Sequence, residues 1–313
     1  MVYHDLKNIV MKENKFNGWI FLDKPVGISS NSALQKVRKI FHHCKAGYVG
    51  TLDPLASGFL PIALGKSTKT IKYLSNINKE YVFEVTWGMQ SSTGDLEGEI
   101  TKTDKTYPSL EEIRNTYKKF IGNYNQAPHK FSSKKVNGKK AYELARKKIH
   151  VDLKKERKRI IELKIIKQVS NSKTLFYIKC SSGTYIRSLA EDMAKALNTF
   201  GVVSSLRRVG FGDLDKKLIS LDYLLSLVHI ECLLSILKPI DMVFNEFNQI
   251  HLDMNEVALI LNGRPIEMSE FKTKINDFCG QLTLAKFKDK LVAVGYLKNG
   301  NFYPKNLLNN FFV

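Results

Sequence analysis

Cysteine is scarce in this sequence, and long apolar runs are missing. The four cysteines, Cys44, Cys180, Cys232 and Cys279, lie far apart and show none of the spacings of a zinc site. They are too few for a disulfide scaffold, so we expect reduced thiols in a cytoplasmic protein. No run of about 18 apolar residues is present, which argues against any membrane span. The first residues lack an apolar signal core, so we expect no secretory leader.

Several enzyme signatures are also absent. The sequence contains no HExxH, GxSxG or GxGxxG, and the donors of His42-His43-Cys44 are adjacent rather than convergent. Residues 65–68 (GKST) resemble the end of a phosphate-binding loop, but Leu60 stands where its first glycine is required. Metal, serine-hydrolase and dinucleotide chemistry therefore lack support, and we interpret residues 65–68 as a loop or helix start.

Acidic residues are few relative to basic ones. The chain has 49 Lys and Arg against 30 Asp and Glu, a net charge of +19. Residues 130–167 hold 15 basic and 4 acidic side chains, whereas residues 250–313 hold 8 and 6. A solvated basic face explains the total charge about as well as a binding surface does. Tyrosine, asparagine and serine between the lysines favour RNA or DNA as the partner.

The length and pattern predict two domains of α+β class. With 313 residues, of which 43% are hydrophobic, the chain exceeds the usual size of one core. We expect strands near residues 18–25, 81–87, 160–169 and 174–180, and helices near residues 31–42, 110–121 and 186–197. These elements do not alternate regularly. They predict a mixed, largely antiparallel sheet with flanking helices.

The last part of the sequence has a different pattern. Short strands are expected at residues 281–287, 291–297 and 301–303, with Asn299-Gly300 as a hairpin turn. They predict a small C-terminal β-barrel with its boundary near residue 248. We therefore expect a catalytic or binding domain over residues 1–247 and a β-domain over residues 248–313.

A polar segment bounded by glycines covers residues 45–58. Within it, Asp53 precedes Pro54, which favours an extended or turn conformation on a loop. An Asp-Pro pair is usually just a turn, because aspartate readily bonds its own backbone. Spacing alone does not make Asp53 catalytic.

Several blocks in order resemble the bacterial tRNA pseudouridine synthase B family. They cover residues 17–215 densely and the tail weakly. The matching blocks are residues 22–30 (LDKPVGISS), 47–58 (GYVGTLDPLASG), 79–81 (KEY), 93–95 (TGD), 126–128 (QAP), 135–146 (KVNGKKAYELAR), 180–189 (CSSGTYIRSL) and 206–208 (LRR).

This resemblance implies that uridine 55 in the TΨC arm of tRNA is isomerised to pseudouridine, without a cofactor or metal, after the base is flipped out. Asp53 matches the catalytic carboxylate, Arg187 the arginine that pairs with it, and Tyr81 the tyrosine placed against the target base. Whether Asp53 attacks the sugar, attacks the base or removes a sugar proton stays open. The ordinary alternatives are a surface cation for Arg187 and a strand aromatic for Tyr81.

The resemblance also implies substrate contacts. Tyr48 stands where the family usually has histidine, Leu206 resembles a pocket wall, and Lys24 falls in the first block. The basic stretch around residues 124–152 coincides with the family's RNA-gripping insertion, and the tail resembles a PUA-like module. His129 stands where a second proline is common. The expected phosphate contacts are Lys134, Lys135, Lys139 and Lys140.

Three functions remain in view. The first is a monomeric enzyme that acts on tRNA without an obligate protein partner or a membrane. The second is a guide-RNA-dependent pseudouridine synthase subunit, which shares the aspartate motif but works with protein partners. The third is a non-catalytic tRNA-folding chaperone, against which the intact Asp53, Tyr81 and Arg187 argue.

Overall fold

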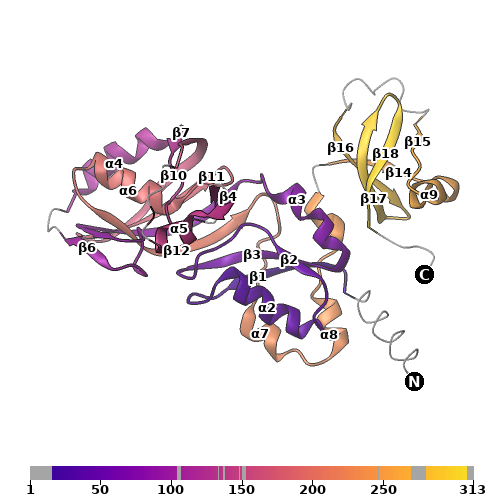
Figure 1. The fold of residues 1–313 in the computed structure, drawn as a ribbon, viewed down its shortest axis with the longest axis horizontal. Helices are drawn as coiled ribbons and strands as arrows, with labels where there is room; N and C mark the ends of the chain where they lie inside the picture. The colour runs from indigo at the N-terminus through magenta and orange to yellow at the C-terminus, as the bar shows by residue number, and fades with distance from the viewer. Residues whose placement is uncertain are drawn as a thin grey trace.

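A large mixed sheet forms the main body of the protein. The computed structural model describes residues 16–103, 107–132, 134–136, 138–147, 149, 153–244, 247–268 and 280–308. The sheet has nine strands in the order β13-β1-β3-β12-β4-β11-β10-β7, with β2 paired to β3 (Figure 1). Its strands are β1 (Gly18–Lys24), β2 (Ala46–Tyr48), β3 (Ala56–Leu64), β4 (Lys79–Trp87), β7 (Gly122–Gln126), β10 (Glu156–Ser170), β11 (Lys173–Cys180), β12 (Gly201–Phe211) and β13 (Ile219–Ser220).

Most neighbouring strands of this sheet run antiparallel. Only the β1–β13 and β3–β12 pairs are parallel. The predicted α+β class with a mixed, largely antiparallel sheet is therefore confirmed. Two smaller pairs lie outside it, β5 (Met89–Ser91) with β6 (Ile100–Thr103), and β8 (Lys135–Val136) with β9 (Lys139–Lys140).

Helices cover one face of the large sheet in two groups. Helix α2 lies with α7 and α8 beside β1 and β3, whereas α4 and α6 lie over the half that carries β10 and β11 (Figure 1). Apolar side chains of α2 and α6 join one continuous core with alternate residues of β1, β3 and β4. The helices are α2 (Ser30–Ile40), α3 (Ile71–Leu74), α4 (Leu110–Tyr117), α5 (Ala141–Arg146), α6 (Ile186–Ala196), α7 (Leu221–Ser226), α8 (Ile230–Ser235) and α9 (Met254–Leu261), with 3₁₀ turns η1 (Gly65–Thr70), η2 (Lys118–Phe120) and η3 (Ile240–Phe244).

Local capping signals account for the helix starts that the sequence predicts. The Ser29 side chain accepts a hydrogen bond from the Ser32 N–H at 3.0 Å and begins α2. Ser109 and Glu112 form the predicted capping box of α4. The segment that resembles a phosphate-binding loop is a 3₁₀ turn, η1, as expected for a helix start.

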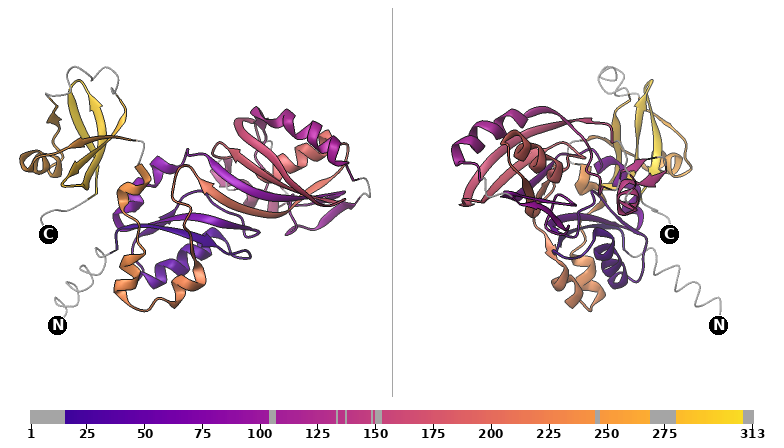
Figure 2. Two further views of the ribbon diagram at one scale, coloured as in Figure 1. Left: turned by 180° about the vertical axis from the view of Figure 1, so that it is seen from behind. Right: turned by 60° about the vertical axis from the view of Figure 1, so that its left-hand side comes forward.

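A second, five-stranded sheet lies beyond α3 and η3, where the Tyr73 hydroxyl donates to Asn306 Oδ1 at 3.2 Å and Lys286 pairs with Asp241 at 3.0 Å. Its order is β14-β16-β17-β18-β15, formed by β14 (Asn248–His251), β15 (Ile266–Glu267), β16 (Leu282–Phe287), β17 (Lys290–Lys298) and β18 (Asn301–Leu307). Trp19, Phe21 and Phe59 share a core with Leu284 and Val294 of this sheet. Figure 2 shows the yellow sheet beyond the indigo half of the molecule, with α4 at the far end.

The curled second sheet is consistent with the expected PUA-like domain. It begins at Asn248 and has its own apolar core around Val257, Val292 and Phe302. The exact division into residues 1–247 and 248–313 stays a proposal. Nowhere in the described ranges does a helix combine the length and apolar character that a membrane span needs.

Candidate active site

Asp53 lies on the loop between β2 and β3, and that loop is anchored on both sides of it. The buried hydroxyl of Ser30, at the start of α2, donates to the Leu52 carbonyl at 2.8 Å and accepts from the Leu52 N–H at 2.7 Å. The Gly27 N–H donates to the Pro54 carbonyl at 2.8 Å. Residues 22–30 therefore hold the backbone on both sides of Asp53, while the Asp53 side chain itself is 40% exposed.

Arg187 reaches Asp53 from the first turn of α6. Its Nη2 lies 2.7 Å from Asp53 Oδ2, and its Nη1 lies 3.1 Å from Asp95 Oδ2. The guanidinium also donates to the carbonyls of Thr93 and Phe131 at 3.1 and 3.3 Å. The structure thus brings together the predicted carboxylate and arginine, which is 8% exposed.

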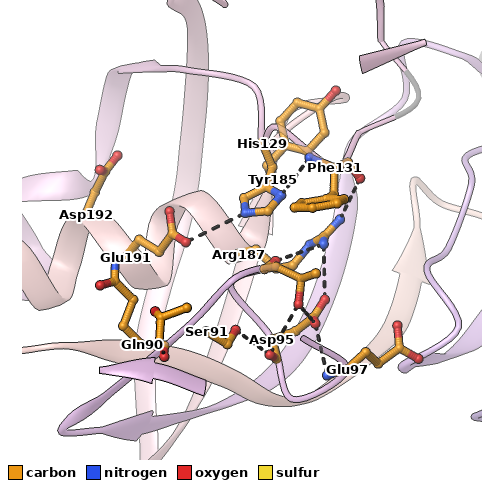
Figure 3. A network of polar contacts seen from close by, with 12 residues as sticks. Gln90, Ser91, Asp95, Glu97, His129, Phe131, Tyr185, Arg187, Glu191 and Asp192 are labelled. Atoms are coloured by element: carbon orange, nitrogen blue, oxygen red, sulfur yellow. Dashed lines mark hydrogen bonds and ion pairs between the residues drawn. The ribbon is translucent and has the colours of Figure 1, made fainter. Parts of the chain in front are cut away.

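Asp95 is the second carboxylate on Arg187, and the sequence reasoning assigned it no role. It lies on the loop between β5 and β6, and its side chain is only 2% exposed. Its Oδ1 accepts from the Thr93 hydroxyl at 2.5 Å and from the Glu97 N–H at 3.1 Å (Figure 3). Such a fully bonded buried carboxylate fixes the arginine, which leaves the exposed Asp53 as the group available to a ligand. The signal was the Thr93-Gly94-Asp95 block.

Gly94 allows a second polar network to pack against this loop. It has a φ of +71°, and a Cβ there would lie 2.8 Å from Glu191 Oε1 and 2.9 Å from His129 Nε2. The Phe131 N–H donates to His129 Nδ1 at 3.2 Å, so the imidazole proton belongs on Nε2, which faces Glu191 at 3.7 Å (Figure 3). Burial raises the pKa of Glu191, but the hydrogen bond from His129, together with the charges of Lys195 and Lys130, outweighs burial and lowers that pKa.

This network holds the side chain of His129, the residue that stands where the resemblance leads us to expect a second proline. Phe131 connects the two networks, because its N–H binds His129 and its carbonyl binds Arg187. His129 therefore supplies a hydrogen-bond acceptor within the segment that supports Arg187.

Tyr81 and Leu206 lie on the central strands next to the Asp53 loop. Leu206 of β12 is paired with Ala56 on one side and with Phe83 on the other, and both Leu206 and Tyr81 are 9% exposed. Burial raises the pKa of Tyr81, an effect that the charge and hydrogen bond of Arg208 oppose and the charge of Asp53 reinforces. Tyr81 is therefore a neutral phenol at neutral pH, in the electrostatic range of Asp53.

Lys24 lies buried at the end of β1, close to the Asp53 loop. Its side chain is fully buried, and Nζ donates to the carbonyls of Pro25 and Ile28 at 2.8 and 2.6 Å. Burial lowers its pKa to about 8, against the charges of Glu97 and Asp53. In this structure Lys24 closes the turn before α2, because the carbonyls of that turn need a donor, and its expected contact with the substrate stays a prediction.

Tyr48 ends β2 opposite Ile62 and is half-buried against the helix-side core. The Leu60 and Ile62 side chains belong to the same core. The ring is thus placed to support the start of the Asp53 loop, and its expected contact with a flipped base stays a prediction.

The basic insertion forms a short hairpin and helix α5 between β7 and β10. Lys134 forms an ion pair with Glu156, which also contacts Lys158 at 2.7 Å, and Lys139 is exposed. The side chains of Lys135 and Lys140 lie outside the described atoms, although their backbones form β8 and β9. Within the described part of the chain, no cluster of three His, Cys, Asp or Glu side chains is arranged to hold a metal ion.

Solved structures of RNA-protein and protein complexes contain chains with this fold. A chain of an H/ACA ribonucleoprotein bound to a substrate RNA containing 2′-deoxyuridine superposes with a TM-score of 0.71, at 22% identity, over 96% of this chain and 87% of that one. A chain of the archaeal Nop10–Cbf5 complex gives a TM-score of 0.69, at 22% identity, over 96% and 88%. At this identity the likeness shows the fold alone.

Sequence relatives match along nearly their whole length. A chain from Bartonella tribocorum named tRNA pseudouridine synthase B is 34% identical over 95% of this chain and 97% of its own. Its namesakes from Ehrlichia canis and Caulobacter vibrioides are 40% and 34% identical, covering 84% and 94% of this chain and 89% and 96% of theirs. The profile of the TruB family pseudouridylate synthase N-terminal domain matches residues 38–186, which include Asp53 and Tyr81. Relatives this similar over this length confirm the resemblance: the chain belongs to the TruB family of pseudouridylate synthases.

Proposed function

We propose that this protein converts uridine 55 in the TΨC arm of tRNA to pseudouridine, with Asp53 as the catalytic carboxylate. The observation that carries the proposal is the Asp53–Arg187 ion pair at 2.7 Å, on a loop whose neighbouring backbone groups are fixed by Ser30 and Gly27. The relatives named tRNA pseudouridine synthase B support tRNA as the substrate.

The chemistry matches these residue types. The net reaction breaks the N1–C1′ bond of the nucleotide and forms a C5–C1′ bond, while C5 releases a proton and N1 gains one. Oxidation states balance, so a charged side chain at the junction of sugar and base is sufficient. Arg187 holds the Asp53 carboxylate in a fixed orientation, because its Nη2 forms a charge-assisted contact with Asp53 Oδ2 at 2.7 Å.

The target nucleotide must leave its stack to reach Asp53. We propose that the base is extruded into the space beside Asp53, with the Tyr81 ring stacked against it and Leu206 at the wall. The basic insertion, with Lys139 exposed on it, grips the phosphates of the same arm. The near-neutral C-terminal sheet then adds a supporting contact.

We further propose that the chain acts as a monomer and needs neither cofactor nor protein partner. The fold neighbours come from assemblies with other proteins, but at 22% identity they bear only on the fold. The end-to-end match to relatives named as tRNA enzymes favours action on free tRNA over a guide-RNA-dependent role. Activity of the purified chain on bare tRNA separates the two.

The test is release of tritium from C5 of labelled uridine in tRNA. Wild type should release it, and Asp53→Asn should not, because the amide keeps the shape but loses the charge. Asp23→Asn is the matched control, since Asp23 also pairs with an arginine, Arg207, at 2.7 Å on the same sheet. A transcript with cytidine at position 55 should give no release. Turnover above background by Asp53→Asn would show that another group carries the reaction.

A further inference from the structure

Arg208 is a charged side chain buried beneath the proposed site. It is 1% exposed, and its guanidinium lies 5.2 Å from the centre of the Phe211 ring. Nε donates to the Phe59 carbonyl at 2.6 Å, and Nη2 donates to the Gly50 carbonyl at 2.9 Å. The β12–β4 register also places this group opposite Tyr81, and its charge and side-chain hydrogen bond oppose the rise that burial causes in the pKa of Tyr81. One side chain thus connects three strands or loops of the site.

Packing alone does not account for a cation at this position. Among the described residues, no carboxylate lies within ion-pair distance of Arg208, and its charged neighbours Lys24 and Lys79 are also cations. Burying a guanidinium without a counter-ion is costly, and an apolar side chain would fill the volume more favourably. What the guanidinium adds is a rigid fork whose donors can reach several acceptors at once.

Two of the three acceptors of Arg208 belong to the Asp53 loop and to Tyr81, the groups whose relative placement the proposed reaction depends on. The antiparallel register of β12 and β4 places Arg208 directly opposite Tyr81. Gly50, whose carbonyl it binds, lies three residues before Asp53 in the same loop. Because a guanidinium only donates, the Tyr81 oxygen must accept, and the phenolic hydrogen is left to point elsewhere.

We propose that Arg208 is a positioning residue for pseudouridine formation, which fixes the Tyr81 hydroxyl and the Asp53 loop relative to one another. This inference rests on the proposed function and concerns the geometry of its site. Arg208 does not touch the substrate. It acts by holding the phenol oxygen, so that the Tyr81 ring and its hydroxyl face the extruded base in one orientation.

A double-mutant cycle tests this role through a coupling that a purely structural residue would not show. Single-turnover rates on labelled tRNA are measured for wild type, Arg208→Met, Tyr81→Phe and the double variant. Arg208→Met should lower the rate by about 10- to 100-fold, with an unchanged tRNA dissociation constant. In the Tyr81→Phe background, Arg208→Met should lower the rate by a factor about ten times smaller, because the hydroxyl that Arg208 positions is gone.

Arg207→Met is the matched control, since Arg207 is the adjacent residue and pairs with Asp23 at 2.7 Å. It should keep the wild-type rate and show no coupling to Tyr81→Phe. If Arg208→Met fails to fold, Arg208→Lys takes its place in the cycle, because lysine keeps the charge but loses the fork. The positioning role would be overturned if the fall in rate of the double variant equalled the product of the two single falls to within about twofold, because the two residues would then not be coupled. A wild type inactive on every tRNA would instead overturn the proposed function, and this role with it.

Discussion

Arg187 pairs with two carboxylates that differ strongly in solvent exposure. This difference predicts how much each carboxylate contributes to stability and to activity. Asp95 is 2% exposed and Asp53 is 40% exposed. Breaking a buried pair by removing one partner costs about 3 to 5 kcal/mol, whereas an exposed pair contributes about 0 to 1 kcal/mol. Asp95→Asn keeps one acceptor for Arg187, and Asp53 still balances part of its charge. We therefore expect Asp95→Asn to lower the free energy of unfolding by about 2 to 4 kcal/mol.

Thermal and urea unfolding measure this difference. For a domain of this size, 1 kcal/mol corresponds to about 2 to 4 °C, so Asp95→Asn should melt about 4 to 16 °C below wild type. Asp53→Asn should melt within about 4 °C of wild type. Activity should follow the opposite order: Asp53→Asn loses turnover completely, while Asp95→Asn keeps part of it below its melting temperature.

The Arg187 variants complete the test. Arg187→Met leaves Asp95 buried without its cation, and it should be less stable than Arg187→Met combined with Asp95→Asn, because the double variant leaves no buried unpaired charge. Equal melting temperatures for Asp53→Asn and Asp95→Asn would refute the division into a supporting and a reactive carboxylate. So would a double variant less stable than Arg187→Met alone.

Three further predictions concern RNA binding, pH and Tyr48. Replacing the four insertion lysines with glutamine should flatten the salt dependence of tRNA binding, each true phosphate contact contributing about 0.7 to 0.9 to the log–log slope; an unchanged slope would place the RNA elsewhere. The four are Lys134, Lys135, Lys139 and Lys140. Burial lowers the pKa of Lys24 from 10.5 to about 8 in the folded protein. Between these two pH values the unfolded chain therefore binds more protons than the folded protein does. The unfolding free energy of wild type should therefore rise relative to Lys24→Met from about pH 8 to 10 in a urea series, and parallel curves would contradict this. Tyr48→Phe should stay active, whereas Tyr48→Ala should lose about 1 to 3 kcal/mol of support for the extruded base, seen by stopped-flow fluorescence of a reporter base. If the base were extruded normally by a Tyr48→Ala protein with a lowered melting temperature, Tyr48 would only pack the loop and would not support the base.

The elements predicted correctly are those with strong local signals. The capping box at Ser109 fixes the start of α4, and a run of β-branched and aromatic residues marks β4. Proline after Lys24 ends β1 where the pattern places the stop. Each of these signals acts within a few residues, so the sequence alone reveals it.

Two central strands of the large sheet, β3 and β12, were not foreseen. Strand β3 contains Gly58 and Pro61, which weaken any β pattern. Pro61 is tolerated because β3 pairs with β12 only at residues 56–58 and with β2 from Ile62 onward. The apolar sequence pattern of strand β12 is interrupted by Arg207 and Arg208, and charged residues are normally exposed. That Arg208 is buried depends on acceptors far away in the sequence, which no local pattern encodes.

The contacts of the Asp53 loop give the separate sequence blocks a common physical reason. Ser30 of the first block binds the backbone beside Asp53, Asp95 of another block fixes Arg187, and Arg208 binds the Gly50 carbonyl. The carboxylate needs exposure to meet a nucleotide, and an exposed loop gains little stability from its own packing. Its geometry must then come from buried partners, each supplied by a different strand or helix. The separate sequence blocks occur together because residues of one block contact residues of another. The Asp53 loop takes this conformation only when all of these contacts are present.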